Sequence, residues 1–261
     1  LRIGVDPKVL KPAAVLGAIS SAKSELVSPE NYAGYARGTF TQTVAKVFFV
    51  YQQLLRLWKA VDFDDLLAET VKLLKNDRGA REELQNRFAH ILVDEYQDTN
   101  KAQYEITKIL AMNSRKLTVV GDAAQAIYSW RGADYRNLML LKQDFPDLTI
   151  LNLEQNYRST QTVLTAANEV ISKNKNHPIL NLWTGREDGE KITVYEAESE
   201  LDEAAFVVSQ LRSLAVAQSI NFSDFAVLYR TNAQSRVLEE AFLHASIPYT
   251  LVGGVRFYER K

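Results

Sequence analysis

Cysteine is absent from the 261 residues, which excludes a disulfide framework and any thiolate metal site. No apolar run approaches the roughly 18 residues that a membrane span needs, so we expect no membrane segment. An excess of one charge is also missing, because 31 Lys and Arg residues nearly balance 32 Asp and Glu residues. A local basic patch can still bind phosphates within a neutral protein. A cytoplasmic location fits this composition.

A glycine-rich phosphate-binding loop is missing as well. The nearest candidate is the stretch 185–191, but its glycines are too close together for G-x-x-x-x-G-K-[ST] and its three acids would repel phosphate. This stretch predicts a hairpin turn. The three histidines, at 90, 177 and 244, are scattered and indicate no metal site. Because the chain begins without Met and stops just after an apparent strand, we expect a segment of a longer protein.

The first 60 residues have the apolar spacing of helices. Apolar side chains recur at helical intervals over 9–26 and 41–60, and Asp62 is placed to cap a further helix over 63–74. From residue 89, short apolar runs alternate with helical patterns, which indicates βαβ units and a parallel sheet. We expect strands at 91–93, 117–120, 148–153, 192–195, 225–228 and 249–252. We expect the intervening helices at 102–111, 135–143, 162–173, 201–217 and 235–245.

Two adjacent carboxylates, Asp94 and Glu95, end the first of these strands. A buried parallel strand delivers such side chains to the carboxyl end of a sheet, where open α/β sheets bind ligands. One acid there can hold a magnesium ion bound to a nucleotide, and the other can orient or deprotonate a water. A lone pair of this kind more often caps the next helix, and that alternative stays open.

The second strand also leads into polar and aromatic side chains. Gln125 follows it and could detect a γ-phosphate through a hydrogen bond. Tyr128 and Trp130 are two residues apart, which would place them on one side of an extended segment. Aromatic rings there can stack on bases without reading their sequence, and Arg131 could hold a backbone phosphate. The alternative is that both rings belong to the core.

Arg158 follows the third expected strand, at a predicted hinge over 152–159 between two α/β pieces. An arginine that crosses such a cleft can stabilise the charge of a transferring phosphate. A salt bridge to a nearby acid is an equally simple role for it.

Taken together, these motifs resemble those of the superfamily-one DNA helicases of the UvrD/PcrA/Rep group. Residues 94–100, Asp-Glu-Tyr-Gln-Asp-Thr-Asn, are similar to the Walker B motif of the group. Residues 120–133 are similar to the motif that couples ATP to single-stranded DNA, and 153–159 to the motif at the junction of two motor lobes. Residues 62–67 and 227–236 also match, in order and over nearly the whole chain.

The resemblance implies a role for each matched position. Asp94 would hold Mg²⁺, Glu95 would activate the attacking water, Gln125 and Arg158 would contact the γ-phosphate of ATP, and Tyr157 would stack on the adenine. A second set would contact single-stranded DNA: Phe63, Tyr128, Trp130, Arg131, Arg230 and Asn232.

The fold that the resemblance implies is α/β. It consists of partial RecA-like P-loop helicase motor lobes, with parallel sheets flanked by helices and an inserted helical subdomain. Residues 1–59 would be part of that subdomain. Residues 60–155 would be the later half of the first lobe, and 156–261 the start of the second.

The function that the resemblance implies is that of a bacterial ATP-dependent DNA helicase in repair or replication. With ATP and Mg²⁺ as cofactors, it would act as a monomer on single-stranded DNA and duplex junctions. The missing Walker A loop departs from the group, as do Ala124 and Ala126, where the group usually has Asp and Ser. We therefore expect no useful ATP hydrolysis by this segment alone. Three alternatives stay open: a non-catalytic nucleic-acid-binding remnant, part of a helicase–nuclease, and an unrelated carboxylate-metal hydrolase.

Overall fold

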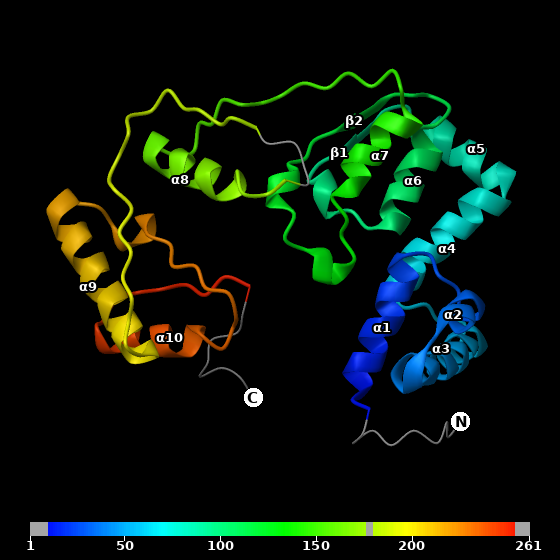
Figure 1. Ribbon diagram of the computed structural model, residues 1–261, viewed down its shortest axis with the longest axis horizontal. Helices are drawn as coiled ribbons and strands as arrows, with labels where there is room; N and C mark the ends of the chain where they lie inside the picture. Colours follow the sequence, from blue (N-terminus) through cyan, green and yellow to red (C-terminus); the bar gives the residue numbers. More distant parts are fainter. Residues whose placement is uncertain (1–9, 176–179, 254–261) are drawn as a thin grey trace. The chain divides into compact units, whose positions relative to one another are not determined.

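The computed structural model describes residues 10–175 and 180–253, and its first elements are all helices (Figure 1). The helices predicted at 9–26, 41–60 and 63–74 are confirmed, although residue 9 lies outside the described residues. Two further helices were not predicted, because one has seven residues and the other is almost entirely polar. The bounds are α1 (Pro12–Ser24), α2 (Pro29–Tyr35), α3 (Gly38–Leu57), α4 (Phe63–Asn76) and α5 (Arg78–Arg87).

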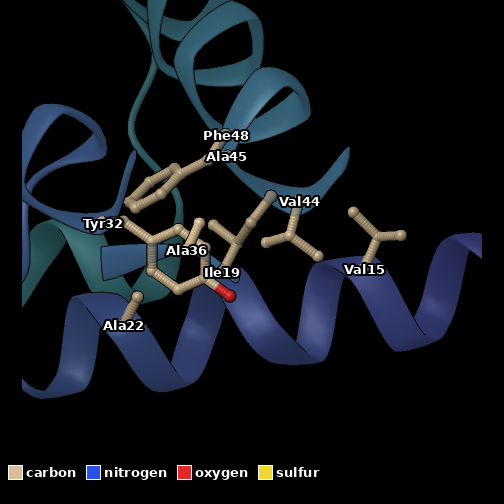
Figure 2. Close-up of a cluster of buried hydrophobic side chains, with 8 residues drawn as sticks. All are labelled: Val15, Ile19, Ala22, Tyr32, Ala36, Val44, Ala45 and Phe48. Carbon is tan, nitrogen blue, oxygen red and sulfur yellow. The ribbon is translucent and has the colours of Figure 1, made fainter. Parts of the chain in front are cut away.

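The first three helices bury a core of their own (Figure 2). Val15 and Ile19 lie one turn apart on α1, and Val44 and Phe48 have the same spacing on α3. Side chains four residues apart share a helix face, so these two faces can pack together. Tyr32 of α2 adds an edge-to-face contact with Phe48, with ring centroids 6.1 Å apart. This packing fixes the end of α1 relative to α3.

A short parallel sheet follows the helices. Strands β1 (Ile91–Val93) and β2 (Leu117–Val119) pair with Ile91 opposite Leu117, and α6 (Lys101–Ala111) connects them. The predicted βαβ unit and both of its strands are therefore confirmed. With α7 (Arg136–Asp144), α6 covers one face of the sheet. The core on that face contains the buried residues Tyr96, Tyr104, Ala111, Leu141 and Phe145.

The other expected strands are absent from the described part of the chain. Residues 148–153, 192–195, 225–228 and 249–252 lack the ladder pairing of a strand. An apolar run becomes a strand when a neighbour supplies partners for its N–H and C=O groups, and β1 and β2 pair with each other. Leu151 and Leu153 are accordingly exposed, as is Leu92 on the uncovered face of the sheet.

The rest of the chain is helical segments joined by extended loops. Helix α8 (Gln161–Ile171) confirms the helix predicted at 162–173, and α9 (Glu200–Gln218) and α10 (Ser235–His244) confirm the last two. The hairpin predicted at 185–191 is wrong. The carbonyl oxygens of Glu187 and Asp188 instead accept hydrogen bonds from the first amides of α8, because Thr160 makes no side-chain cap there.

Contacts divide the chain into one unit over 1–189 and a second over 190–261. The second unit has a separate core around Leu211, Phe242 and Ile247. The domain limits proposed from the sequence, 1–59, 60–155 and 156–261, stay predictions. Over residues 10–175 and 180–253, no helix combines the length and apolarity that crossing a membrane requires.

Candidate functional site

The two predicted acids directly follow β1. Asp94 is exposed, and its Oδ1 accepts a hydrogen bond from the Glu95 amide over 2.9 Å. Glu95 has a left-handed backbone with φ of 50°, and it begins the short 3-10 helix η1 (Tyr96–Asp98). A non-glycine residue in this conformation is uncommon and is found where structure or function requires a sharp turn. This turn presents both carboxylates to solvent at the carboxyl end of the sheet.

Gln97 joins the ends of the two strands. Its side chain is buried, its Nε2 donates to Glu95 Oε2 over 2.7 Å, and its Oε1 accepts from the Asp122 amide over 3.0 Å. Gly121 makes this approach possible, since a Cβ at that position would lie 2.8 Å from Gln97 Oε1. Both ends of one amide are thus used to hold Glu95 in register with the end of β2.

Gln125 continues this hydrogen-bonded chain. The Asp122 carboxylate accepts from the Ala124 amide over 2.9 Å and from Gln125 Nε2 over 3.0 Å, in the 3-10 helix η2 (Ala123–Gln125). The structure therefore brings together Glu95 and Gln125, which the sequence analysis placed at the same sheet edge.

The aromatic pair lies on a turn and not on an extended segment, so that expectation is wrong. Tyr128 precedes the 3-10 helix η3 (Ser129–Arg131), yet its ring centroid is still 6.3 Å from that of Trp130. Trp130 is 65% exposed, which rules out the core alternative for its ring. Gly132 ends η3 with φ of 80°, a conformation that favours glycine. The side chain of Arg131 lies outside what the structure describes.

Phe63 is the first residue of α4 and is 90% exposed. The predicted cap of this helix is confirmed, because Asp62 Oδ1 accepts from the Asp65 amide over 2.8 Å. The Asp65 carboxylate accepts in return from the Asp62 amide. This reciprocal cap fixes where the helix begins and therefore where the Phe63 ring leaves it.

Tyr157 and Arg158 lie on a separate turn of the first unit. Asn156 Oδ1 accepts from the amides of Arg158 and Ser159, while the Tyr157 hydroxyl donates to Gln155 over 2.8 Å. Both predicted residues are exposed. The hydrogen bonds of this turn run to its own residues, to Trp183 and to Arg186, so the structure does not join it to Glu95 or Gln125 within the described residues.

Arg230 and Asn232 belong to the second unit. Gln234 Oε1 accepts from the Arg230 amide over 3.0 Å and the Thr231 amide over 2.9 Å, which shapes an exposed turn before α10. The Asn232 carbonyl accepts from Ser235. The turn leaves both predicted side chains at the surface.

Two family models match consecutive parts of this sequence. The UvrD/REP helicase N-terminal domain matches residues 2–146, and the UvrD-like helicase C-terminal domain matches residues 151–261. The chain belongs to the UvrD/REP helicase family. The resemblance inferred from the motifs is confirmed, and so is the α/β class of the fold.

Individual relatives agree with this membership in the UvrD/REP family. The chain is 46% identical over 259 residues to the ATP-dependent DNA helicase PcrA of Leuconostoc citreum. It is 47% identical over 257 residues to the protein of that name from Bacillus subtilis, and 48% to that from Staphylococcus aureus. These matches cover 98–99% of this chain but 35% of each relative. The chain thus spans about a third of the length of the curated relatives.

The carboxylates of this UvrD/REP chain fit one kind of magnesium site. Over residues 10–175 and 180–253, no three His, Asp or Glu side chains gather closely enough to hold a metal ion. Mg²⁺ commonly binds one or two carboxylates and completes its shell with nucleotide phosphates and water. The oxygen donors of Asp94 therefore suit Mg²⁺ that arrives with a nucleotide. Asp98 lies three residues after Glu95 in the same motif, and its pKa is raised by burial and by the negative charge of Glu95.

Two residues of the UvrD/REP chain contact the surroundings of predicted site residues, although the sequence analysis gave them no role. Gln97 lies within the matched motif 94–100, but one of its two hydrogen bonds comes from the Asp122 amide, which is distant in sequence. Lys23 ends the series Val15, Ile19, Lys23, whose spacing of four places it on the buried face of α1. A lysine on an apolar face signals a buried ion pair, and that signal could have identified it.

Proposed function

We propose that this chain is the segment of an ATP-dependent DNA helicase that couples ATP hydrolysis to movement along single-stranded DNA and to duplex unwinding. It would consist of partial RecA-like lobes with an inserted helical subdomain. The subdomain would end at residue 59 and the first lobe at residue 155. Family membership supports this proposal, as do relatives that are named ATP-dependent DNA helicases.

The observation that carries the proposal is the hydrogen-bonded chain from Glu95 through Gln97 and Asp122 to Gln125. It links a carboxylate able to orient a water with an amide able to detect a γ-phosphate. The Tyr128–Trp130 turn begins three residues after Gln125. A shift of Gln125 on ATP binding would therefore be transmitted to the aromatic rings.

The remaining proposed roles follow the family motifs. Asp94 would hold Mg²⁺ with the nucleotide, Arg158 would contact the γ-phosphate, and Tyr157 would stack on the adenine. Single-stranded DNA would meet aromatic rings and polar side chains: Phe63, Tyr128, Trp130, Arg131, Arg230 and Asn232. The location in the cytoplasm, the monomeric state and a role in repair or replication remain part of this proposal.

Binding of oligo(dT) to the 261-residue chain tests the DNA surface. We expect Trp130→Ala to weaken binding by about 1–3 kcal/mol, because the loss of one stacking ring costs that much. The loss should be similar for oligo(dT) and for a mixed-sequence strand, since stacking does not read the base. Fluorescence anisotropy at one fixed salt concentration measures both affinities.

Phe88→Ala is the matched control, because it removes an exposed ring at the end of α5, away from the family motifs. It should leave the affinity unchanged. If Trp130→Ala binds as tightly as the unchanged chain while its circular dichroism is native, Trp130 is not a DNA platform. If the chain binds DNA and the complete gene product lacks DNA-stimulated ATPase activity, the non-catalytic alternative replaces the helicase.

A further inference from the structure

The last residues of α1 contact two features that carry aromatic rings. Under the proposed function, these rings contact single-stranded DNA. Lys23 is only 4% exposed, and its ammonium lies 2.6 Å from Asp62 Oδ2 and 2.8 Å from Asp65 Oδ1. Asp62 and Asp65 are the two carboxylates that cap α4. Lys23 therefore holds, from a different helix, the cap from which Phe63 projects.

Helix α3 completes this buried network. The Tyr51 hydroxyl donates to Asp62 Oδ2 over 2.9 Å, and Gln52 Nε2 donates to Asp65 Oδ1 over 3.1 Å. The Lys23 ammonium also lies 5.1 Å from the centroid of the Tyr51 ring. Burial opposes the ionisation of Asp62, but hydrogen bonds from Lys23, the Asp65 amide and Tyr51 outweigh it and lower the pKa of Asp62. Side chains of α1 and α3 thus fix the cap of α4.

The next residue, Ser24, supports the aromatic turn. Ser24 is buried, and its Cβ would lie 3.0 Å from a Cβ placed on Gly132. Gly132 ends η3, which carries Trp130. Two adjacent residues of α1 therefore contact two separate features. Lys23 contacts the cap that precedes Phe63, and Ser24 lies against the end of the Tyr128–Trp130 turn.

We infer that Lys23 and Ser24 are positioning residues that set the spacing between Phe63 and the Tyr128–Trp130 pair. This inference rests on the proposed function, because it takes these rings as the contacts to single-stranded DNA. A buried ion pair of this kind gives a fixed geometry at little net gain in stability. Its consequence is that two buried residues of the helical segment before residue 60 affect DNA binding.

A double-mutant cycle between Lys23→Met and Phe63→Ala tests whether Lys23 acts through Phe63. In oligo(dT) binding by the 261-residue chain, we expect Phe63→Ala to weaken affinity about fivefold or more. We expect Lys23→Met to cause a loss of similar size. In the double variant the affinity should stay within about twofold of Phe63→Ala alone, because the position of an absent ring no longer matters. A general loss of structure would instead reduce the affinity further.

Lys108→Met is the control, because Lys108 also makes an ion pair between two helices, with Asp144 between α6 and α7, although that pair is less buried. It should leave DNA affinity unchanged. The inference is overturned if folded Lys23→Met binds DNA normally. It is also overturned if the fold-loss of affinity in the double variant equals the product of the two single fold-losses. If Phe63→Ala itself has no effect on affinity, the proposed contact between Phe63 and DNA is wrong. That outcome differs from a failure of the positioning role, in which Phe63→Ala weakens binding and Lys23→Met does not.

Tyr51→Phe serves if Lys23→Met does not fold. It removes one hydrogen bond to Asp62 and leaves no buried charge unpaired. We expect about a twofold loss of affinity that disappears in the Phe63→Ala background. An unchanged affinity for Tyr51→Phe would overturn the inference.

Discussion

At the scale of single residues, Gln97 is the side chain on which the candidate site depends most. Its amide meets the Glu95 carboxylate at one end and the Asp122 backbone at the other. Gln97→Leu keeps the size of the side chain and removes both hydrogen bonds. We expect the free energy of unfolding to fall by about 1–3 kcal/mol, because a partly buried amide and a carboxylate lose a partner. Urea unfolding at neutral pH measures this change.

Gln42→Leu is the control for that substitution, since Gln42 is exposed on α3. Its effect should lie within about 0.5 kcal/mol of zero. Equal effects of the two substitutions would mean that the bridge between the strands contributes nothing to stability.

Some residues of the site can be read from the sequence and others cannot. Asp94, Glu95 and Gln125 were predicted because each lies shortly after an apolar run, which is a local pattern. The roles of Gln97 and Lys23 depend on partners that are 25 and 39 residues away. Hydrogen bonds between distant segments leave no periodic signal in a sequence, so these two roles emerged from the structure.

At the scale of elements, one ion pair joins the two helices that cover the sheet. Asp144 at the end of α7 accepts hydrogen bonds from Lys108 and from the Tyr104 hydroxyl of α6. Burial disfavours the charged carboxylate, but these two hydrogen bonds outweigh it and lower the pKa of Asp144 below its ordinary value of 3.8. The stability that this carboxylate contributes is therefore present above about pH 4 and is lost as the pH falls through the lowered pKa.

Asp144→Asn tests this dependence on pH. We expect it to lower the free energy of unfolding by about 1 kcal/mol at pH 7, and the difference from the unchanged chain should shrink at pH 3. Urea unfolding at the two pH values measures both differences. Asp188→Asn, at an exposed position, is the control, and its effect should lie within about 0.5 kcal/mol of zero. A difference that grows in acid would contradict the assigned sign.

Helices were predicted better than strands, and the reason is physical. The apolar spacing of α3 and α4 is local, so their existence and approximate ends follow from the sequence. A strand is stabilised by pairing with another strand, so apolar runs such as 148–153 remain unpaired unless a neighbour is present. The expected strands β1 and β2 formed because each supplies the other's partner.

At the scale of the whole molecule, the proposed function gives this chain part of a nucleotide site. Glu95, Gln125 and an acid suited to nucleotide-bound Mg²⁺ are positioned by the sheet. A loop of the form G-x-x-x-x-G-K-[ST], whose backbone amides and lysine cradle phosphates, does not occur among the 261 residues. The curated relatives are about three times as long as this chain, which leaves room in them for such a loop.

ATP hydrolysis therefore separates this chain from a complete helicase. We expect the 261-residue chain to release no more phosphate from ATP than its Glu95→Gln variant, with or without oligo(dT). An orienting carboxylate cannot act on a γ-phosphate that nothing holds in place. In the complete gene product the same substitution should abolish DNA-stimulated hydrolysis, while Glu105→Gln on α6, where the carboxylate pairs with Lys75, should not. Turnover by the chain alone that is stimulated by DNA and lost in Glu95→Gln would show that other residues of the chain bind the phosphates.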